Sequence, residues 1–118
     1  MSVRRGDVVL IDAPFVTRPG SKIRPMLVVQ TDVNNARMAN TIVVTISTNL
    51  SRSREPTQVL IDVGTPAGRQ SGLLASSVAS CENLLTIRQA HVIRTIGRLP
   101  GSVMHEVDEA LKASLGLS

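Results

Sequence analysis

The sequence predicts a mainly β fold (α+β) that ends in one amphipathic helix. Two observations predict this fold class. Up to Pro100 the chain consists of short segments rich in β-branched residues, separated by clusters of Gly, Pro and Ser. After Pro100 the apolar residues instead recur at helical spacing. We therefore expect a small barrel of about five to seven strands, closed by a terminal helix, in one domain over residues 1–118.

Six segments have the composition of strands. They are residues 7–13, 24–31, 41–47, 57–63, a short fifth strand within 74–78, and 93–99. Residues 81–85 extend or follow the fifth strand, residues 32–40 form a turn or one helical turn, and residues 86–92 form a short helix. The loops 14–22, 49–56 and 64–72 each carry arginine, so cations lie where a ligand can reach them.

The last segment has the pattern of a helix that packs on one side. Its apolar residues are Val103, Met104, Val107, Ala110, Leu111 and Leu115. Pro100 or Ser102 marks its start and Gly116 its end. Its polar side is acidic, which excludes a helix lying on an anionic membrane surface. We expect it to cover the barrel or a second subunit.

Composition excludes several classes of protein. No apolar run approaches the roughly 18 residues of a membrane span. The start of the chain lacks the apolar region of a signal peptide, so we expect a cytoplasmic protein. The single Cys81 forms no intramolecular disulfide and is best explained as a small core residue. With only two histidines, we expect no metal site and no cofactor.

The charge points to a polyanionic partner. The net charge is +4, and of 13 basic residues only Lys22 and Lys112 are lysines. Arginine suits bidentate recognition of phosphate. The last twenty residues carry Glu106, Asp108 and Glu109 against Lys112, a balance of −2, which leaves +6 on the body. Ordinary solubility charge is the alternative explanation.

Aromatic residues are almost absent, which limits how nucleic acid could be bound. Phe15 is the single aromatic residue of the sequence. Single-strand binders of the RRM or OB type stack bases on several aromatic rings. This chain must instead rely on arginine, hydroxyl and backbone groups, with Phe15 as one stacking platform.

Two apolar segments each carry polar residues at one end. Arg24 precedes Pro25 at the start of one, and Ser47 and Thr48 end the next. If the two strands are antiparallel neighbours, Arg24 lies near the hydroxyls. A guanidinium beside hydroxyls on a rigid sheet can hold a phosphate. Alternation sends Ser47 and Thr48 to opposite faces, so one of the two points at Arg24.

Four segments, in order, resemble one known family. They are Val3-Arg4-Arg5-Gly6-Asp7-Val8, Arg24-Pro25-Met26-Leu27-Val28-Val29-Gln30-Thr31-Asp32, Ile46-Ser47-Thr48-Asn49 and Met104-His105-Glu106-Val107-Asp108-Glu109-Ala110-Leu111. Together they resemble the MazF/PemK toxins, the ribonuclease halves of bacterial toxin–antitoxin pairs. The likeness covers nearly the whole chain.

This resemblance implies an SH3-like, CcdB/PemK-like barrel and a homodimer. It also implies metal-independent cleavage of single-stranded RNA through the 2′-hydroxyl, and inhibition by a cognate antitoxin with a disordered segment. The family's catalytic arginine corresponds to Arg24. Its catalytic hydroxyl corresponds to Ser47 by spacing, with Thr48 in the same motif.

The resemblance also implies an RNA groove across the dimer, formed by the loops 14–22 and 49–56. The candidate RNA-binding residues there are Phe15, Thr17, Arg18, Lys22, Asn49, Arg52 and Arg54. Glu82 and Asn83 fall where the family places base-reading polar residues.

Three alternatives stay open at this point. Related barrels inhibit DNA gyrase by binding, without cutting anything. An SH3-like nucleic-acid-binding module is a second alternative. A two-histidine ribonuclease built on His91 and His105 is a third, although neither histidine belongs to the Arg24 group.

Overall fold

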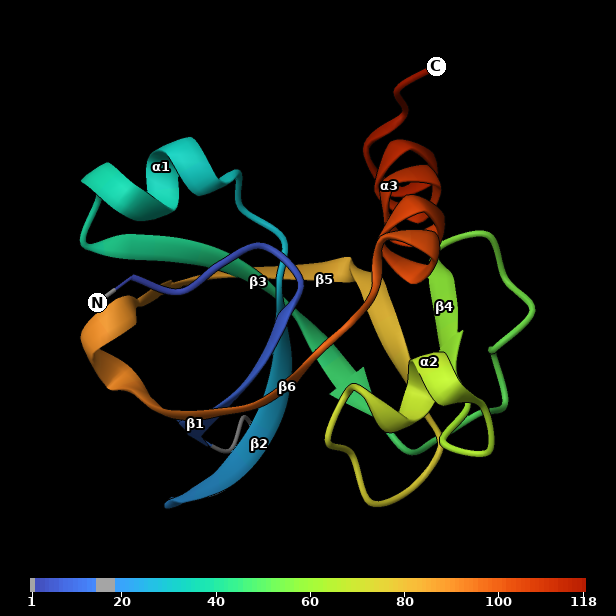
Figure 1. The fold of residues 1–118 in the computed structure, drawn as a ribbon, viewed down its shortest axis with the longest axis horizontal. Coiled ribbons are helices and arrows are strands. Elements are labelled where there is room, and N and C mark those ends of the chain that lie inside the picture. The colour runs from blue at the N-terminus through green and yellow to red at the C-terminus, as the bar shows by residue number, and fades with distance from the viewer. Residues whose placement is uncertain (1, 15–18) are drawn as a thin grey trace.

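A computed structural model describes residues 2–14 and 19–118 of the chain (Figure 1). The strands are β1 (Asp7–Pro14), β2 (Ser21–Val28), β3 (Asn40–Ser47), β4 (Gln58–Ile61), β5 (Ser77–Arg88) and β6 (Val92–Arg98). The helices are α1 (Asp32–Arg37), α2 (Pro66–Arg69) and α3 (Gly101–Leu115), with a 3₁₀ turn η1 (Gln89–His91).

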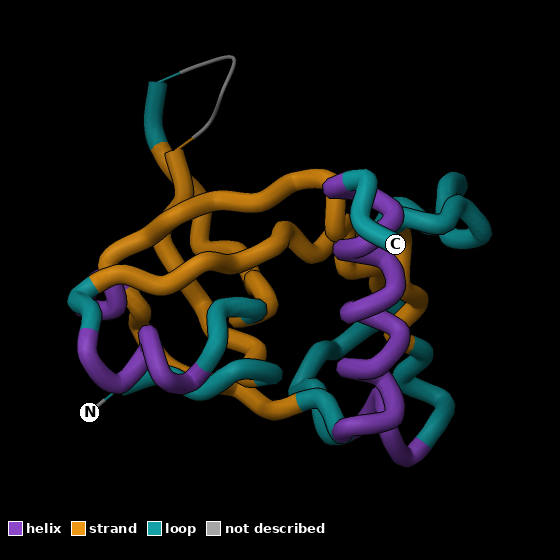
Figure 2. Tube along the Cα trace, turned by 90° about the horizontal axis from the view of Figure 1, so that it is seen from above, coloured by secondary structure: helices purple, strands orange, loops and turns teal. Residues whose placement is uncertain are grey.

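The strands form a single antiparallel sheet in the order β4-β5-β3-β2-β1-β6. The predicted mainly β fold with a terminal helix is confirmed. The sheet is curved (Figure 2), but no ladder among the described residues joins its edge strands β4 and β6, so hydrogen bonds do not close it into a barrel. The name SH3-like barrel stays a prediction.

Helix α3 covers one face of the sheet, beside β4 and β5 (Figure 1). Val103, Met104, Val107 and Ala110 are buried there, against apolar residues of every strand from β1 to β5. Gly116 adopts the left-handed conformation just after the helix, so the predicted end is confirmed. Among the described residues no helix is long and apolar enough to cross a membrane.

The opposite face of the sheet carries a second, smaller core. Its buried members come from β1, β2 and β3: Val9, Ile11, Ala13, Met26, Val28 and Val43. Because side chains alternate along a strand, odd residues of β3 face this core and even residues face α3. This parity decides which side chains meet at the end of β3.

Strand β2 starts and ends three residues earlier than predicted, at Ser21–Val28 instead of 24–31. Beyond Val28 the backbone N–H groups of Val29 and Gln30 both donate to Ile42 O of β3 (2.9 and 3.3 Å), which ends the regular ladder, and a buried polar network follows. The Gln30 amide donates to Asn35 Oδ1 (2.9 Å), and the Thr41 hydroxyl donates to the same oxygen (2.7 Å). This network fixes the turn through α1, which confirms the predicted helical turn.

Strand β5 differs most from its prediction. It runs over Ser77–Arg88, so residues 81–85 extend the strand predicted within 74–78, as one of the two alternatives expected. Of the short helix predicted over 86–92, residues 86–88 belong to β5 and the 3₁₀ turn η1 takes up Gln89–His91. Val44 pairs with Leu84 whereas Thr45 pairs with Ser80, so residues 81–83 have no partner on β3. This three-residue bulge places the polar residues Glu82 and Asn83 inside a long strand.

The segment before β5 is held tightly against β6. Arg98 donates its backbone N–H to Gln70 O (2.8 Å). Gly72 has φ +74°, and a Cβ there would lie 2.1 Å from Ile96 O, so the close approach requires glycine. The predicted loop 64–72 therefore contains α2 and a fixed turn, and it presents Leu73 and Leu74 beside β1 and β6.

Candidate active site

Arg24 lies in β2, exposed, on the face of the smaller core. It pairs directly across from Ile11 of β1, a member of that core. The β2–β3 ladder runs from Val28–Val43 to Met26–Thr45 and stops there. Continued by two residues, the same register would set Arg24 opposite Ser47. The two strands are antiparallel neighbours, and Arg24 and Ser47 share a face by parity.

Ser47 ends β3 and opens on a polar pocket. Its Oγ accepts a hydrogen bond from the Asn49 backbone N–H (3.1 Å). We call this hollow of about 210 Å³ the Ser47 pocket; it is lined by Thr45, Ser47, Asn49, Ser51, Arg52, Gln58, Val78, Ser80 and Asn83. All but one of the lining residues are polar, so the pocket suits a ligand with hydrogen-bonding edges.

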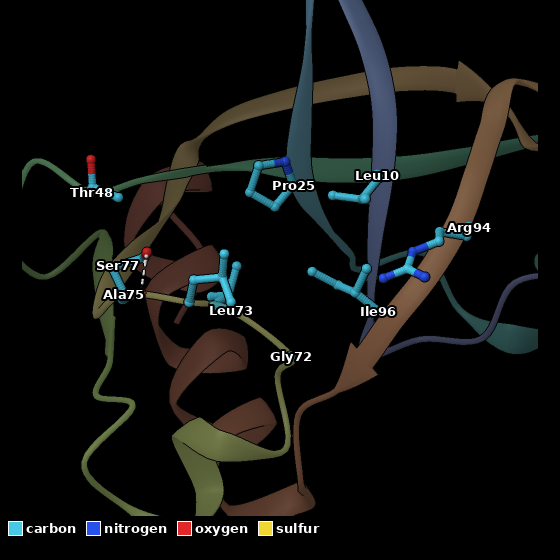
Figure 3. A pocket seen from close by; sticks show the side chains of 10 residues that line it. Leu10, Pro25, Thr48, Gly72, Leu73, Ala75, Ser77, Arg94 and Ile96 are labelled. Carbon is cyan, nitrogen blue, oxygen red and sulfur yellow. Dashed lines mark hydrogen bonds between the residues drawn. The ribbon is translucent and has the colours of Figure 1, made fainter.

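Thr48, one residue later, opens on a different pocket (Figure 3). We call this hollow of about 380 Å³ the apolar pocket; its lining residues are Leu10, Pro25, Thr48, Gly72, Leu73, Leu74, Ala75, Ser77, Arg94 and Ile96. The two residues therefore line pockets on opposite faces of the sheet, as alternation predicts, although the Thr48 hydroxyl oxygen itself points away from the apolar side chains in Figure 3. Pro25 pairs with Leu10 across β1, and both line the face that Thr48 shares.

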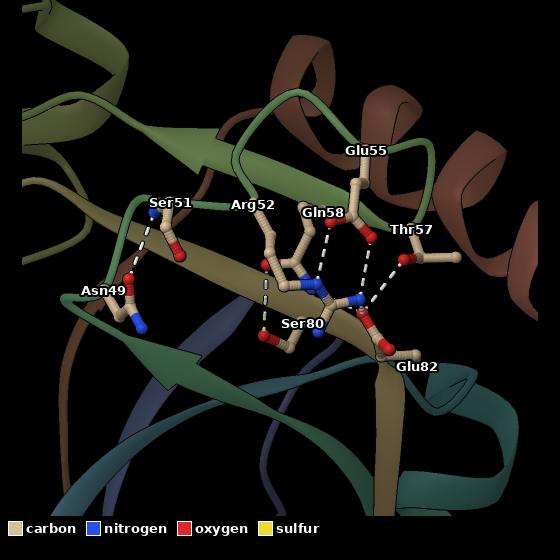
Figure 4. Close-up of polar contacts among 8 residues, drawn as sticks. All are labelled: Asn49, Ser51, Arg52, Glu55, Thr57, Gln58, Ser80 and Glu82. Atoms are coloured by element: carbon tan, nitrogen blue, oxygen red, sulfur yellow. Dashed lines mark hydrogen bonds and ion pairs between the residues drawn. The ribbon is translucent and has the colours of Figure 1, made fainter.

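A set of ion pairs, which we call the Arg52 clasp, ties the loop after β3 to strand β5 (Figure 4). The Arg52 guanidinium donates to both Glu55 oxygens (2.8 Å each) and to Glu82 Oε1 (2.6 Å). Hydrogen bonds from Arg52, Gln58 and Thr57 lower the pKa of Glu82, and the bond from Arg52 lowers that of Glu55. Arg52 is thus matched by two carboxylates, and the clasp has a net charge of −1.

Two residues at the base of the Ser47 pocket were not singled out from the sequence. Gln58 and Ser80 are 9% and 7% exposed, and the Ser80 hydroxyl donates to Gln58 Oε1 (3.3 Å). Gln58 Nε2 donates to Glu82 Oε1 (2.6 Å). The one signal in the sequence is a glutamine opening the apolar run Gln58-Val59-Leu60-Ile61. Its partner stands 22 positions away, which no local pattern relates to it.

The other predicted RNA-binding residues fall in several places. Asn49 and Asn83 line the Ser47 pocket, and Lys22 is exposed in β2, not in a loop. Arg54 lies away from the pocket, in a groove beside α3. Glu82 belongs to the clasp. The remaining three, Phe15, Thr17 and Arg18, lie outside the described residues.

Cysteine and histidine do not join this group. Cys81 is fully buried in the core under α3, and burial raises the pKa of its thiol to about 11, so it is not a thiolate at neutral pH. His91 ends η1 and His105 lies on α3, two elements that lie apart in Figure 1. The two-histidine alternative therefore has no geometric support.

Comparison with known proteins gives full-length matches. Residues 4–115 match the family described as PemK-like, MazF-like toxin of type II toxin-antitoxin system. Endoribonuclease EndoA of Bacillus subtilis (strain 168) is 35% identical over 118 residues, covering 99% of this chain and 97% of that protein. Endoribonuclease MazF of Staphylococcus epidermidis is 32% identical over 117 residues, covering 98% and 93%.

A solved structure shares the fold. It is an endoribonuclease from a mycobacterial species in complex with its cognate antitoxin. It superposes with a TM-score of 0.79 at 22% identity and covers 99% of this chain and 98% of its own. The sheet with a C-terminal helix is therefore the fold of this group of toxins.

Proposed function

We propose that this chain, which belongs to the PemK-like, MazF-like toxins of type II toxin–antitoxin systems, is a cytoplasmic endoribonuclease that cuts single-stranded RNA at a specific sequence. The observation that carries the proposal is the 35% identity to a named endoribonuclease over 118 residues. The geometry at the end of β3 is compatible with it, because a guanidinium and a hydroxyl share one face there.

In this proposal Arg24 stabilises the phosphoryl group. An arginine guanidinium keeps its proton in proteins, so it is poorly suited to accept one as a general base. Two N–H donors held on the phosphoryl oxygens instead oppose the charge that builds up in the transition state. Removing one such donor from an active site costs about 2.7–4 kcal/mol. Arg24 is exposed on β2, so a bound RNA strand can reach its guanidinium group.

Ser47 supplies the catalytic side-chain hydroxyl in this proposal. It accepts from the Asn49 N–H, so its own O–H remains available to donate to a phosphoryl oxygen. The RNA 2′-oxygen loses its proton and attacks phosphorus, and the P–O5′ bond breaks. The 5′-oxygen takes up a proton, which leaves a 2′,3′-cyclic phosphate and a 5′-hydroxyl. The RNA supplies the nucleophile, so the step needs no metal-bound water.

The active species is a homodimer, and a cognate antitoxin inhibits it. Two copies of a body with charge +6 meet about a two-fold axis and form one cationic groove. The same groove attracts RNA and the acidic disordered segment of an antitoxin, so the two compete. Light scattering on the purified chain should give twice 12.6 kDa. A monomer that still cuts RNA would contradict the shared groove.

Incubation with RNA in EDTA tests the activity. We expect cleavage in EDTA, with a 2′,3′-cyclic phosphate on the product. A substrate with 2′-deoxyribose at the cut nucleotide should resist, whereas normal cutting of that substrate would mean that water or a side chain attacks. Binding without any cleavage would favour the non-catalytic alternative, which the identity to named endoribonucleases argues against.

A further inference from the structure

The Ser47 pocket has the size and the chemistry of a site for one ring-shaped polar group. Its volume of about 210 Å³ is several times the roughly 30 Å³ that a water molecule occupies in the liquid. The bulge at residues 81–83 of β5 removes the strand pairing beside it. Ser47 lies at its edge, and Gln58 and Ser80 form its buried base.

The amide of Gln58 is held in one orientation. Glu82 is ionised at neutral pH, since the Arg52, Gln58 and Thr57 hydrogen bonds lower its pKa, and an ionised carboxylate can only accept. Nε2 of Gln58 must therefore face Glu82 (2.6 Å), which leaves Oε1 toward the Ser80 hydroxyl (3.3 Å). Figure 4 shows this chain of contacts running from Glu55 through Arg52 and Glu82 to Gln58 and Ser80.

We propose that the Ser47 pocket receives one base of the substrate RNA, next to the cut phosphate, and that Gln58 and Ser80 read its edge. This inference rests on the proposed ribonuclease function. Gln58 keeps a second amide N–H and a second carbonyl lone pair, and Ser80 keeps acceptor capacity. A fixed set of donors and acceptors accepts one base and leaves polar groups unpaired against another.

The composition of the chain supports reading by hydrogen bonds. With one aromatic residue in the sequence, base stacking on aromatic rings contributes little to recognition. Sequence-specific RNA binders take unstacked single-stranded bases and bond their edges. A polar pocket beside Ser47 supplies such edge contacts at the position where the strand is cut.

Glu82 has a different role in this proposal from the one that the sequence predicts. It was expected to contact a base directly, but its carboxylate is occupied by Arg52, Thr57 and Gln58. It acts as a positioning residue that fixes the Gln58 amide. In Glu82→Gln the new amide both donates and accepts, so Gln58 is free to turn and present either end.

Cleavage of a randomised single-stranded RNA pool by the full chain tests the proposal. Sequencing of the cut ends gives the preference at every position. Ser80→Ala should weaken discrimination at a single position beside the cut by roughly threefold to tenfold, the value of one hydrogen bond. Glu82→Gln should relax the same position.

Ser77→Ala is the matched control, because Ser77 lies three residues away on β5 and lines the apolar pocket. It should leave the preference unchanged. If folded Ser80→Ala keeps the wild-type preference, or loses cutting uniformly on all sequences, the assignment of the Ser47 pocket as a base-binding site is contradicted. A wild-type chain that cuts no RNA at all overturns the proposed function itself, and the base pocket with it.

Discussion

The two hydroxyls at the end of β3 are chain neighbours with opposite surroundings. Ser47 opens on a polar pocket of about 210 Å³ whose base is Gln58 and Ser80. Thr48 lies at the edge of an apolar pocket of about 380 Å³ that Leu10, Pro25 and Leu73 also line (Figure 3). One residue of register therefore separates a surface that can bond a phosphate or a base edge from one that can bury apolar groups.

The same division extends across the sheet. Arg24 pairs with Ile11 and lies on the Ser47 side, whereas Arg94 pairs with Leu10 and lines the apolar pocket. Two exposed arginines on nearby strands thus belong to opposite faces. If RNA chemistry takes place on the Ser47 side, equivalent substitutions on the two sides must have unequal effects.

The largest effect is expected at Arg24. Arg24→Ala should lower kcat by a factor of hundreds to thousands, because it removes donors to the phosphoryl oxygens, about 2.7–4 kcal/mol. Arg24→Lys should also be poor, since a point charge cannot make paired N–H contacts. Single-turnover cleavage measures both, with circular dichroism as the check on folding.

Arg94→Ala is the matched control for this substitution. It removes an exposed arginine from the apolar side and should leave the chemical step within about threefold. Equal losses in the two variants would break the comparison between the faces, and full activity of Arg24→Ala would remove Arg24 from the mechanism.

A smaller effect is expected on the salt dependence of RNA binding, where Lys22 and Arg52 should differ. Lys22 is exposed, and no described residue forms an ion pair with it, whereas Arg52 is held by Glu55 and Glu82. Lys22→Ala should reduce the slope of log binding constant against log salt by about 0.7, the value for one single-strand phosphate contact. Arg52→Ala should leave the slope unchanged. RNA titrations at several salt concentrations measure this, and a larger change for Arg52→Ala would show that the clasp opens on RNA.

The smallest effect is expected on the stability of the fold at acidic pH. Since the bonds from Arg52, Gln58 and Thr57 lower the folded pKa of Glu82, its contribution to stability is complete above the unfolded pKa of about 4.3. That contribution is lost as the pH falls through the lowered folded value. Thermal melts from pH 7 to pH 3 should therefore fall less steeply for Glu82→Gln than for the wild type. Parallel curves would mean that the clasp adds nothing measurable, as is common for exposed ion pairs.

Regular elements with a strong pattern were predictable from the sequence. Helix α3 has an apolar stripe and ends at Gly116, and β3 is a continuous β-branched run, so both match their predictions closely. Local composition decides such segments because each buries one continuous face.

Elements that depend on distant partners were not predictable in this way. The end of β2 is set by buried Gln30, which bonds Asn35 only once the turn has formed. The sequence left open whether residues 81–85 continue β5, because Glu82 and Asn83 interrupt its pattern, and a bulge accommodates them. Gln58 and Ser80 meet only through the pairing of β4 with β5, so the base of the Ser47 pocket was missed.

The most direct test of the division between the two faces is the activity of Ser47→Ala beside that of Thr48→Ala, on one RNA substrate in EDTA. A hydrogen bond to a charged group contributes about 1.5–3 kcal/mol, so Ser47→Ala should lose roughly tenfold to 150-fold in kcat/KM. Thr48→Ala should stay within about threefold of the wild type. The opposite ranking would contradict the assignment and move the chemistry to the side of the apolar pocket.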